Sequence, residues 1–325
     1  METFITVTLT LFPSVLLILN LLGNIIVIVV ICKNKSLQNA NTLLLSNLAL
    51  ADVIFTVQGF VEIMIVLYND EDYVPSLFIV RALVSIFTLA ALSIERYFAI
   101  LKPFVYLAKA AKSLLCKVIL VTWVLAGVLG VPGIYIEVFN IGNHEETGNA
   151  TMTISTWREN FNVIYSFVLL VSGFIVPSAV IIFCYARVIC HLWFDTEASE
   201  ATQIVLFKSR RKLTKLFIIV TAIFLVTWCP NFTMRVVKQF VSDSDHKRRL
   251  KLSSIVLAMA GSTANPVLYS FRSPNFRREV TKLFKCCTCC KRRRPNFPKI
   301  NATNSYTLTQ LKKKEEERRT INCEM

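Results

Sequence analysis

Seven long apolar runs follow one another along the chain, with short polar segments between them. The runs cover residues 8–32, 42–67, 74–101, 114–136, 162–190, 211–240 and 251–271. A bilayer core about 30 Å thick needs roughly 20 apolar residues per helix, and each run is long enough. One run alone could be a buried helix of a soluble protein. Seven in one chain predict an all-α membrane protein, a bundle of seven transmembrane helices.

Charge is distributed unevenly between the two sides of this bundle. Hydrophobic residues make up 54% of the 325 residues and charged residues only 18%, yet the net charge is +15. The connections after the first, third and fifth runs and the C-terminal segment carry +18, whereas the N-terminal residues and the other connections carry −5. Lys and Arg gather on the cytoplasmic side of short loops, so the N-terminus is predicted outside and the C-terminus inside. The loop at 242–251 is a local exception, with a charge of +2.

The same composition predicts four segments in a multi-pass protein of the plasma membrane. They are a short extracellular N-terminus at 1–7, a seven-transmembrane domain at 8–271, an interfacial amphipathic helix with a cysteine cluster at 272–290, and a disordered basic cytoplasmic tail at 291–325. The first run is too long for a signal-peptide core, so it is interpreted as a retained signal anchor. A soluble nucleic-acid-binding protein is excluded, because the chain is too apolar.

The segment after the seventh run combines an apolar face with cysteines. Four apolar residues recur at helical spacing: Phe276, Val280, Leu283 and Phe284. This spacing is typical of a helix that lies in the membrane interface. Four cysteines follow directly: Cys286, Cys287, Cys289 and Cys290. Juxtamembrane cysteines favour palmitoylation, and a zinc site is the alternative, although four cysteines within five residues cannot easily surround one tetrahedral ion. The basic run Lys291–Arg294 adds attraction to anionic inner-leaflet lipid.

The predicted outer loops contain no cysteine, which excludes an extracellular disulfide framework. The triplet Asn149-Ala150-Thr151 lies in the largest outer loop and is a glycosylation candidate. We expect no metal site and no cofactor.

Polar residues and prolines inside the runs are few, and they usually mark function, because polar groups in a bilayer are costly. In chain order they include Gly23-Asn24, Asn47 to Asp52, Glu95-Arg96-Tyr97, Trp123, Pro177, Tyr185, Phe224, Trp228-Cys229-Pro230 and Asn265-Pro266-Val267-Leu268-Tyr269. On these motifs, which occur in all seven runs, the chain resembles the rhodopsin-like (class A) G-protein-coupled receptors from about residue 12 to about 290. The subfamily stays unassigned.

The resemblance implies a receptor that signals by movement of the sixth helix. Pro177, Pro230 and Pro266 each remove a backbone hydrogen bond and can kink a helix, although packing irregularity is the plain alternative. The family's connector between ligand pocket and sixth helix matches Ile86, Pro177 and Phe224, and its ligand-sensing aromatic residue matches Trp228.

By the same resemblance, Arg96 at the inner end of the third helix carries the signal. Glu95 would hold it in the resting receptor, and on activation it would meet Tyr185, Tyr269 and the G protein. The alternative is an interfacial arginine that reaches out to lipid phosphates. Family members often hold this arginine with a second acid on the sixth helix, but the matching position here is Arg210. We therefore expect only Glu95 to restrain Arg96, and higher basal signalling than in members with that acid.

The family's midplane polar cluster, which often holds a sodium ion, matches Asn24, Asp52, Ser85, Ser262 and Asn265, with Gly261 in place of a further asparagine. Arg81 lies four residues, about one turn, outward of Ser85. A guanidinium at that depth needs a partner, and the two candidates are Asp52 and Glu62. With Asp52, a fixed cation would replace the exchangeable sodium. The alternative is an outward-facing Arg81 that reaches the interface.

The residues of the predicted ligand pocket exclude two ligand classes. A retinal-binding member needs a lysine where this chain has Met259, and an amine-binding member needs an aspartate where it has Phe78. The acids Glu62 and Asp70–Asp72 would suit a cationic peptide, as in melanocortin receptors. Arg235 and Lys238 add positive charge, so a small zwitterion fits as well.

The sequence thus predicts a receptor that binds an extracellular peptide or small polar or zwitterionic molecule and activates heterotrimeric G proteins. A lipid receptor is the alternative, and a transporter or channel is a remote one, since we find no inverted repeats or broken helices. No enzyme is expected, because the three histidines lie in loops or at helix ends. The expected partners are the ligand, a G protein, membrane lipids, arrestin and receptor kinases, but no nucleic acid.

Overall fold

The computed structural model describes residues 2–68, 78–109, 112–142, 149–193, 201–237, 240, 244–272 and 276–282. These residues are nearly all helical and include no strand. The elements are α1 Glu2–Lys33, a 3-10 turn η1 Lys35–Leu37, α2 Ala40–Tyr68, α3 Phe78–Leu101, α4 Pro103–Lys109, α5 Lys112–Gly142, α6 Asn149–Leu170, a π-helical segment η2 Val171–Ile175, α7 Val176–Trp193, α8 Ala201–Val237 and α9 Ser244–Arg272. The prediction of an all-α fold is confirmed.

Six helical segments are long and apolar enough to cross a membrane. They are Leu11–Lys33, Ala40–Ile65, Ile79–Leu101, Ser113–Gly133, Asn160–Trp193 and Arg210–Val237. Each coincides with one predicted run, and the fifth combines α6, η2 and α7. The seventh run lies within α9, which has 29 residues. The side to which the N-terminus belongs stays a prediction from the charges.

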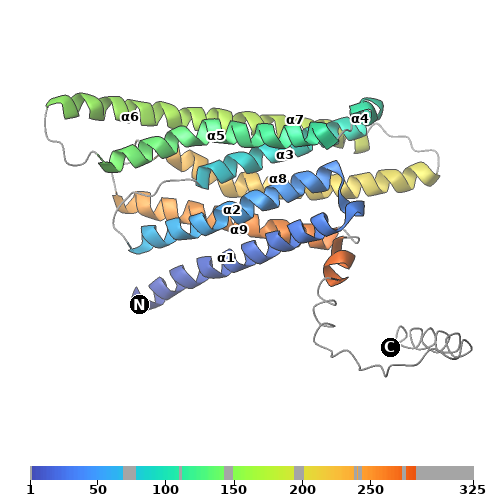
Figure 1. Ribbon diagram of the computed structural model, residues 1–325, viewed down its shortest axis with the longest axis horizontal. Helices are drawn as coiled ribbons and strands as arrows, with labels where there is room; N and C mark the ends of the chain where they lie inside the picture. Colours follow the sequence, from blue (N-terminus) through green and yellow to red (C-terminus); the bar gives the residue numbers. More distant parts are fainter. Residues whose placement is uncertain are drawn as a thin grey trace, which may run out of the picture. The chain divides into compact units, whose positions relative to one another are not determined.

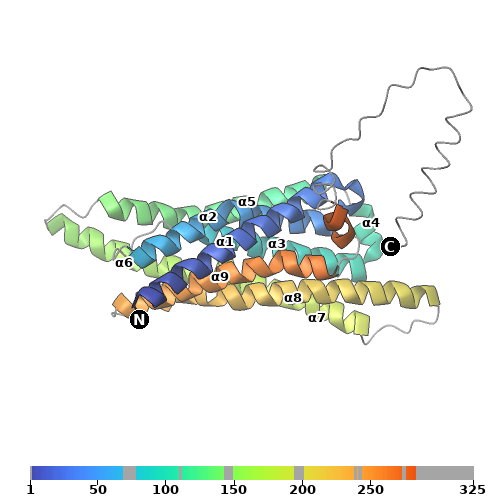
Figure 2. The ribbon, with the colours of Figure 1, turned by 90° about the horizontal axis from the view of Figure 1, so that it is seen from below.

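The long helices lie side by side and alternate in direction (Figure 1). Helix α1 begins at the end of the bundle where α2 ends and α3 begins, and α4 lies at the opposite end, as the view turned by 90° also shows (Figure 2). Helix α3 is central and packs against α2, α5, α7 and α8. In its apolar segment 61% of the residues are buried, against 17% in that of α5. The polar motifs on α3 are therefore inside the bundle.

Several helices extend beyond the runs that predicted them. Helix α1 begins at Glu2, α6 at Asn149 and α8 at Ala201. Hydrophobicity marks the part of a helix that lipid surrounds, whereas propensity and packing decide where the helix itself ends. Asn149, expected in a loop, is thus the first residue of α6, and its side chain lies outside the described residues. The short helix α4 and the π-helical segment η2 are not predicted by hydrophobic periodicity.

Two glycines allow neighbouring helices to approach closely. A Cβ atom on Gly23 of α1 would lie 2.8 Å from Cγ of Pro266 on α9. A Cβ atom on Gly261 of α9 would lie 2.8 Å from Cβ of Thr227 on α8. Neither position has room for a side chain. Gly261, which stands where the family has an asparagine, therefore lies at a tight contact between α8 and α9.

Residues 276–282 form a further helical stretch after α9. Phe276 is buried, whereas Arg277 and Arg278 are exposed, in keeping with the amphipathic pattern predicted for this segment. Leu283, Phe284, the four candidate palmitoylation cysteines and the segment 291–325 lie outside the described residues, so palmitoylation and lipid contact remain predictions.

Candidate functional site

Of the two partners that the sequence leaves open for Arg81, the structure shows Asp52. The Arg81 Nη2 atom lies 2.9 Å from Oδ1 of Asp52, and Nε donates to the same oxygen at 3.0 Å. Arg81 has a relative exposure of 0% and Asp52 of 1%, so Arg81 does not reach the membrane interface. This pair joins α2 to α3 in the interior of the bundle.

Helix α9 contributes to the same carboxylate. Nδ2 of Asn265 donates to Oδ2 of Asp52 at 3.3 Å, and Ser262 is buried about one turn away on α9, where its Oγ donates to the carbonyl oxygen of Ala258 at 3.3 Å. Ser85 is buried on α3, one turn from Arg81. The structure therefore brings together Asp52, Arg81, Ser262 and Asn265 from three helices, which we call the midplane cluster.

Asn24 belongs to a neighbouring arrangement of its own. Its Nδ2 atom donates to the Oδ1 atom of Asn20 at 2.9 Å, and Thr56 Oγ1 donates to that same oxygen at 2.9 Å. All three side chains are fully buried. They link α1 to α2, and the described hydrogen bonds of Asn24 are with Asn20 rather than with the residues around Asp52.

The predicted connector residues are all buried on three different elements. Ile86 lies on α3, Pro177 in the first turn of α7 and Phe224 on α8. The ring of Phe224 stacks on Trp228 with a centroid distance of 5.7 Å. The Arg81 guanidinium lies over the Trp228 ring, 5.7 Å from its centroid, so the midplane cluster touches the connector. Helices α8 and α9 continue through Pro230 and Pro266.

The π-helical segment η2 lies directly before Pro177 and is part of this region. Its Gly173 is packed so closely on α3 that an added Cβ atom would lie 2.6 Å from Cδ2 of Leu83. Phe174 stacks on Phe232 of α8 at 5.0 Å. Single π-helical turns inside α-helices are frequent at functional sites. Here the π-helical segment η2 contacts α3 through Gly173 and α8 through Phe174.

The motif residues Asn47 of α2 and Trp123 of α5 are joined by a hydrogen bond. Trp123 Nε1 donates to Oδ1 of Asn47 at 3.0 Å, and Asn47 Nδ2 donates to Oγ1 of Thr88 at 2.9 Å. This chain of hydrogen bonds fixes α2, α3 and α5 together.

Near the C-terminal end of α3, Arg96 is buried, with a relative exposure of 7%, rather than extended into lipid. Its Nε atom lies 3.1 Å from Oε2 of Glu95 and donates to Oδ1 of Asn41 on α2 at 2.6 Å. Its guanidinium lies over the ring of Phe217 on α8, at 5.0 Å. The expectation that only Glu95 restrains Arg96 is therefore wrong, because α2 and α8 hold it as well.

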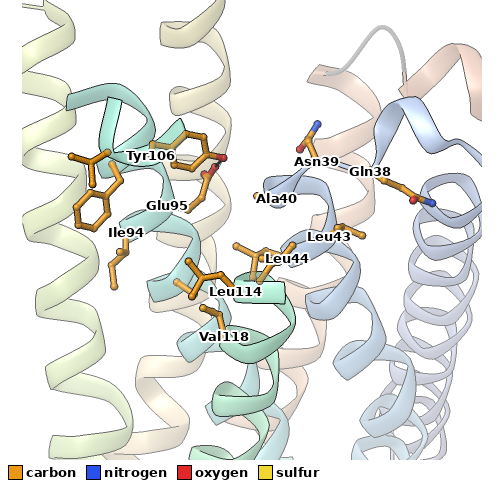
Figure 3. A pocket seen from close by; sticks show the side chains of 14 residues that line it. Gln38, Asn39, Ala40, Leu43, Leu44, Ile94, Glu95, Tyr106, Leu114 and Val118 are labelled. Atoms are coloured by element: carbon orange, nitrogen blue, oxygen red, sulfur yellow. Dashed lines mark hydrogen bonds between the residues drawn. The ribbon is translucent and has the colours of Figure 1, made fainter. Parts of the chain in front are cut away.

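Glu95 is itself positioned by the short helix α4. The Tyr106 hydroxyl donates to Oε1 of Glu95 at 2.6 Å. Burial, with a contribution from this hydrogen bond, raises the pKa of Tyr106 to about 12, so the phenol stays protonated at neutral pH. Figure 3 shows both side chains on the wall of an apolar cavity of about 540 Å³, which Leu43, Ile94 and Leu114 also line.

The ends of α7 and α8 that lie near Arg96 are joined by contacts between them. Tyr185 of α7 is buried. Tyr97 stacks on Phe183 at 6.3 Å. Arg211 Nε donates to the carbonyl oxygen of Leu192 at 2.7 Å, which satisfies a carbonyl at the end of α7. Helix α8 is thus tied to α7 next to Arg210, where other family members have an acid.

The predicted ligand pocket is described only in part. Met259 is fully buried on α9, and Arg235 is half-buried in the last turn of α8. The side chains of Glu62, Phe78 and Tyr269 lie outside the described residues, as do Asp70–Asp72. Among the residues that the structure describes, no group of three His, Cys, Asp or Glu could hold a metal ion.

Sequence reasoning missed several residues that the structure places at these sites, among them Asn20, Asn41, Thr56, Tyr106 and Phe217. Asn20 and Asn41 could have been found, because Asn20 is a polar residue inside an apolar run and Asn41 directly precedes one. Tyr106 has no such signal, since it lies in a connection and reaches Glu95 only through the fold of α4.

Comparisons with known proteins agree with this architecture. A family model described as 7 transmembrane receptor (rhodopsin family) matches residues 23–269. Galanin receptor 2a of Danio rerio is 28% identical over 298 residues, which are 86% of this chain and 79% of the relative. Somatostatin receptor type 1 of Rattus norvegicus is 28% identical over 284 residues, 83% of this chain and 70% of the relative. Tachykinin-like peptides receptor 86C of Drosophila melanogaster is 26% identical over 304 residues, 87% and 60% of the two chains.

The family match covers more than half of the chain, and it runs from the Gly23-Asn24 motif of the first span to Tyr269 of the seventh. Together with the helical bundle and its interior polar clusters, it assigns the chain to a family of receptors rather than enzymes. This protein belongs to the rhodopsin family of seven-transmembrane receptors.

Proposed function

We propose that this chain is a plasma-membrane receptor for an extracellular peptide and that it activates heterotrimeric G proteins by movement of the inner half of α8. In this mechanism the bundle exchanges between two states, and the peptide binds one of them more tightly. No catalytic step is involved.

The observation that carries the proposal is the environment of Arg96. Glu95, Asn41 and Phe217 hold its guanidinium on three sides, and Phe217 belongs to α8. An outward movement of α8 removes the Phe217 ring from the guanidinium and opens the space beside it. Arg96 is then able to leave Glu95 and contact the partner protein. This arrangement suits a switch, because two of the three restraints come from other helices and a helix movement can break them.

The peptide class rests on the relatives. They are named for galanin, somatostatin and tachykinin-like peptides. A small zwitterion is the second candidate, and the specific observation in its favour is Arg235 in the last turn of α8, which would bind a carboxylate. A peptide with a C-terminal carboxylate or an acidic side chain would satisfy the same arginine.

The test is a screen of peptides and small zwitterions on cells that express the full chain, with nucleotide exchange on G proteins as the readout. The matched control is Arg96→Ala at equal surface expression. We expect an activating peptide with the wild-type chain and no response in the variant, because the guanidinium is lost. A full response in Arg96→Ala, or activation by zwitterions but by no peptide, would contradict the corresponding part of the proposal.

A further inference from the structure

The Asp52 carboxylate is already neutralised by a cation of the protein itself. Two nitrogen atoms of Arg81 lie 2.9 and 3.0 Å from its Oδ1 atom. The side chains of the two residues have relative exposures of 0% and 2%, so no bulk water screens the pair. A buried acid that is paired in this way has no remaining net charge with which to attract a second cation.

Relatives in this family often hold a sodium ion at this carboxylate, so the fit of sodium to these residues can be examined. A sodium ion on Asp52 would lie within a few ångströms of the Arg81 guanidinium, and like charges repel strongly in a medium of low dielectric constant. Gly261 offers no side-chain oxygen where relatives have an asparagine, and Thr227 fills the adjacent space. The residues of this chain therefore do not fit a sodium ion.

The other oxygen of the carboxylate is also engaged by the protein. Asn265 of α9 donates to Oδ2 at 3.3 Å. A carboxylate that accepts this bond and an ion pair is well satisfied without solvent. Displacing Arg81 would leave the Asp52 carboxylate buried without its cation, which is costly.

Arg81 also connects this site to Trp228. The guanidinium carbon lies 5.7 Å from the centroid of the indole ring, within the range of a cation–π contact. Trp228 in turn stacks on Phe224 of the same helix. Hence the position of one buried cation is linked to α2 through Asp52 and to α8 through Trp228.

From this geometry we propose that Arg81 is a built-in counter-ion, which occupies the family's sodium site permanently and makes the receptor insensitive to sodium. The ion in relatives is exchangeable, whereas this cation is part of α3 and moves only with that helix. The equilibrium between the two bundle states then depends on α3, Asp52 and Trp228, not on the sodium concentration outside the cell. This inference concerns a single ion site and holds for the chain whether or not it couples to a G protein.

The experiment compares thermal unfolding of the purified full-length receptor in sodium chloride and in potassium chloride at equal ionic strength. For the wild type we expect the same midpoint in both salts. For Arg81→Gln, which keeps the size and hydrogen bonding but loses the charge, sodium should raise the midpoint on the order of 2–4 °C over potassium. Arg81→Lys keeps the cation and should again give equal midpoints.

A sodium-dependent midpoint in the wild type would overturn the proposal, and this result needs no variant to fold. Equal midpoints for a folded Arg81→Gln would also contradict it, because the charge of Arg81 would then not be what keeps sodium out. The double variant Arg81→Gln/Asp52→Asn removes the carboxylate that would bind sodium, so its midpoints should be equal. A sodium effect that survives in this double variant would place the ion elsewhere and likewise count against the proposal.

A second readout connects the ion site to signalling and depends on the proposed function. Ligand-free nucleotide exchange by the wild type should be equal in the two salts, whereas sodium should lower it in Arg81→Gln. If no G protein responds under any condition, the proposed function fails while the unfolding experiment still decides the ion site. The two proposals therefore fail separately.

Discussion

Two arginines lie buried on the same helix, and they are held in different ways. Arg81 and Arg96 are 15 residues apart on α3, about 22 Å along the helix axis. Arg81 is completely buried and pairs with an acid on another helix, α2. Arg96 has a relative exposure of 7% and pairs with Glu95, its neighbour on α3. One ion pair thus crosses between helices, and the other stays within a single turn.

This difference suggests two roles: the Arg81–Asp52 pair holds two helices together, which we call the clamp, and Arg96 can change its partner, which we call the switch. To separate Arg81 from Asp52, α2 and α3 must move apart, or a charge must be left alone in the bundle interior, which is costly. Arg96 can leave Glu95 by rotation of its side chain once α8 has moved the Phe217 ring away, because Arg96 and Glu95 lie on the same helix and need not separate as helices. We infer that Arg81 maintains the bundle and that Arg96 transmits the signal.

The largest expected effect comes from breaking the clamp. Arg81→Leu leaves the Asp52 carboxylate buried without its cation, and removing one partner of a buried ion pair typically costs about 3–5 kcal/mol. We expect the thermal midpoint of the purified receptor to fall by about 10 °C. The double variant Arg81→Leu/Asp52→Leu should regain part of this loss, since it leaves no unpaired charge.

The matched control is Arg96→Leu, which makes the same change at the other arginine. Because the side chains of Arg96 and Glu95 are 9% and 11% exposed, against 0% and 2% for Arg81 and Asp52, this variant should lose less stability. Equal losses in Arg81→Leu and Arg96→Leu would remove the distinction between clamp and switch.

For signalling, we expect the larger effect from a change at Arg96 and the smaller effect from a change at Arg81. Arg96→Ala is expected to abolish ligand-stimulated G-protein activation while it leaves the fold intact, because it removes the group that we propose to contact the G protein. Arg81→Lys keeps the buried cation and should retain most of the response. Both variants are measured by nucleotide exchange at matched receptor density. A response lost in Arg81→Lys but kept in Arg96→Ala would reverse the assignment.

The level of ligand-free signalling should depend on the hydrogen bond between Arg96 and Asn41. The Asn41 side chain accepts this hydrogen bond from Arg96 at 2.6 Å, and hydrogen bonds to charged groups contribute about 1.5–3 kcal/mol. If the bond is made only in the resting state, Asn41→Ala should raise ligand-free signalling roughly tenfold. Asn41→Asp adds a negative charge beside the guanidinium and should lower it. A change in the same direction for both variants would argue that Asn41 acts through packing.

The smallest effect concerns Tyr106. Its pKa of about 12 lies above the ordinary value of 10, so the folded protein favours the protonated phenol. The contribution of Tyr106 to stability is therefore complete below about pH 10 and is lost as the pH rises from there towards 12. The wild type should lose slightly more stability than Tyr106→Phe across this window, whereas both should respond alike between pH 6 and pH 9. Thermal midpoints of the two proteins over the pH series provide the measurement.

The fold could be predicted from the sequence more completely than the sites. The seven apolar runs match the observed helices, because a lipid environment demands continuous apolar segments with internally satisfied backbones. The helix α4 and the π-helical segment η2 were missed. The first is short and lies outside the lipid, and the second depends on the packing of Gly173 against Leu83 of another helix.

The candidate sites were predicted unevenly for a similar reason. Family motifs identified Arg96, Asp52 and Trp228, but they did not give the neighbours of these residues. Asn41 and Phe217 complete the surroundings of Arg96 from α2 and α8. Their roles depend on how those two helices are rotated about their axes, which no local pattern in the sequence reports.

The sequence by itself determined that this protein crosses the membrane repeatedly and that its few polar residues lie at particular positions within the spans, and it named Asp52 and Glu62 as candidate partners of Arg81. These follow from the cost of placing charge and bare backbone in lipid. Only the tertiary structure decided which of the two acids pairs with Arg81. Asp52 and Glu62 are both on α2, ten residues apart, and the depth and rotation of α3 against α2 bring the guanidinium to Asp52. Contacts between helices arise from packing of whole surfaces, so they become visible only when the helices are assembled.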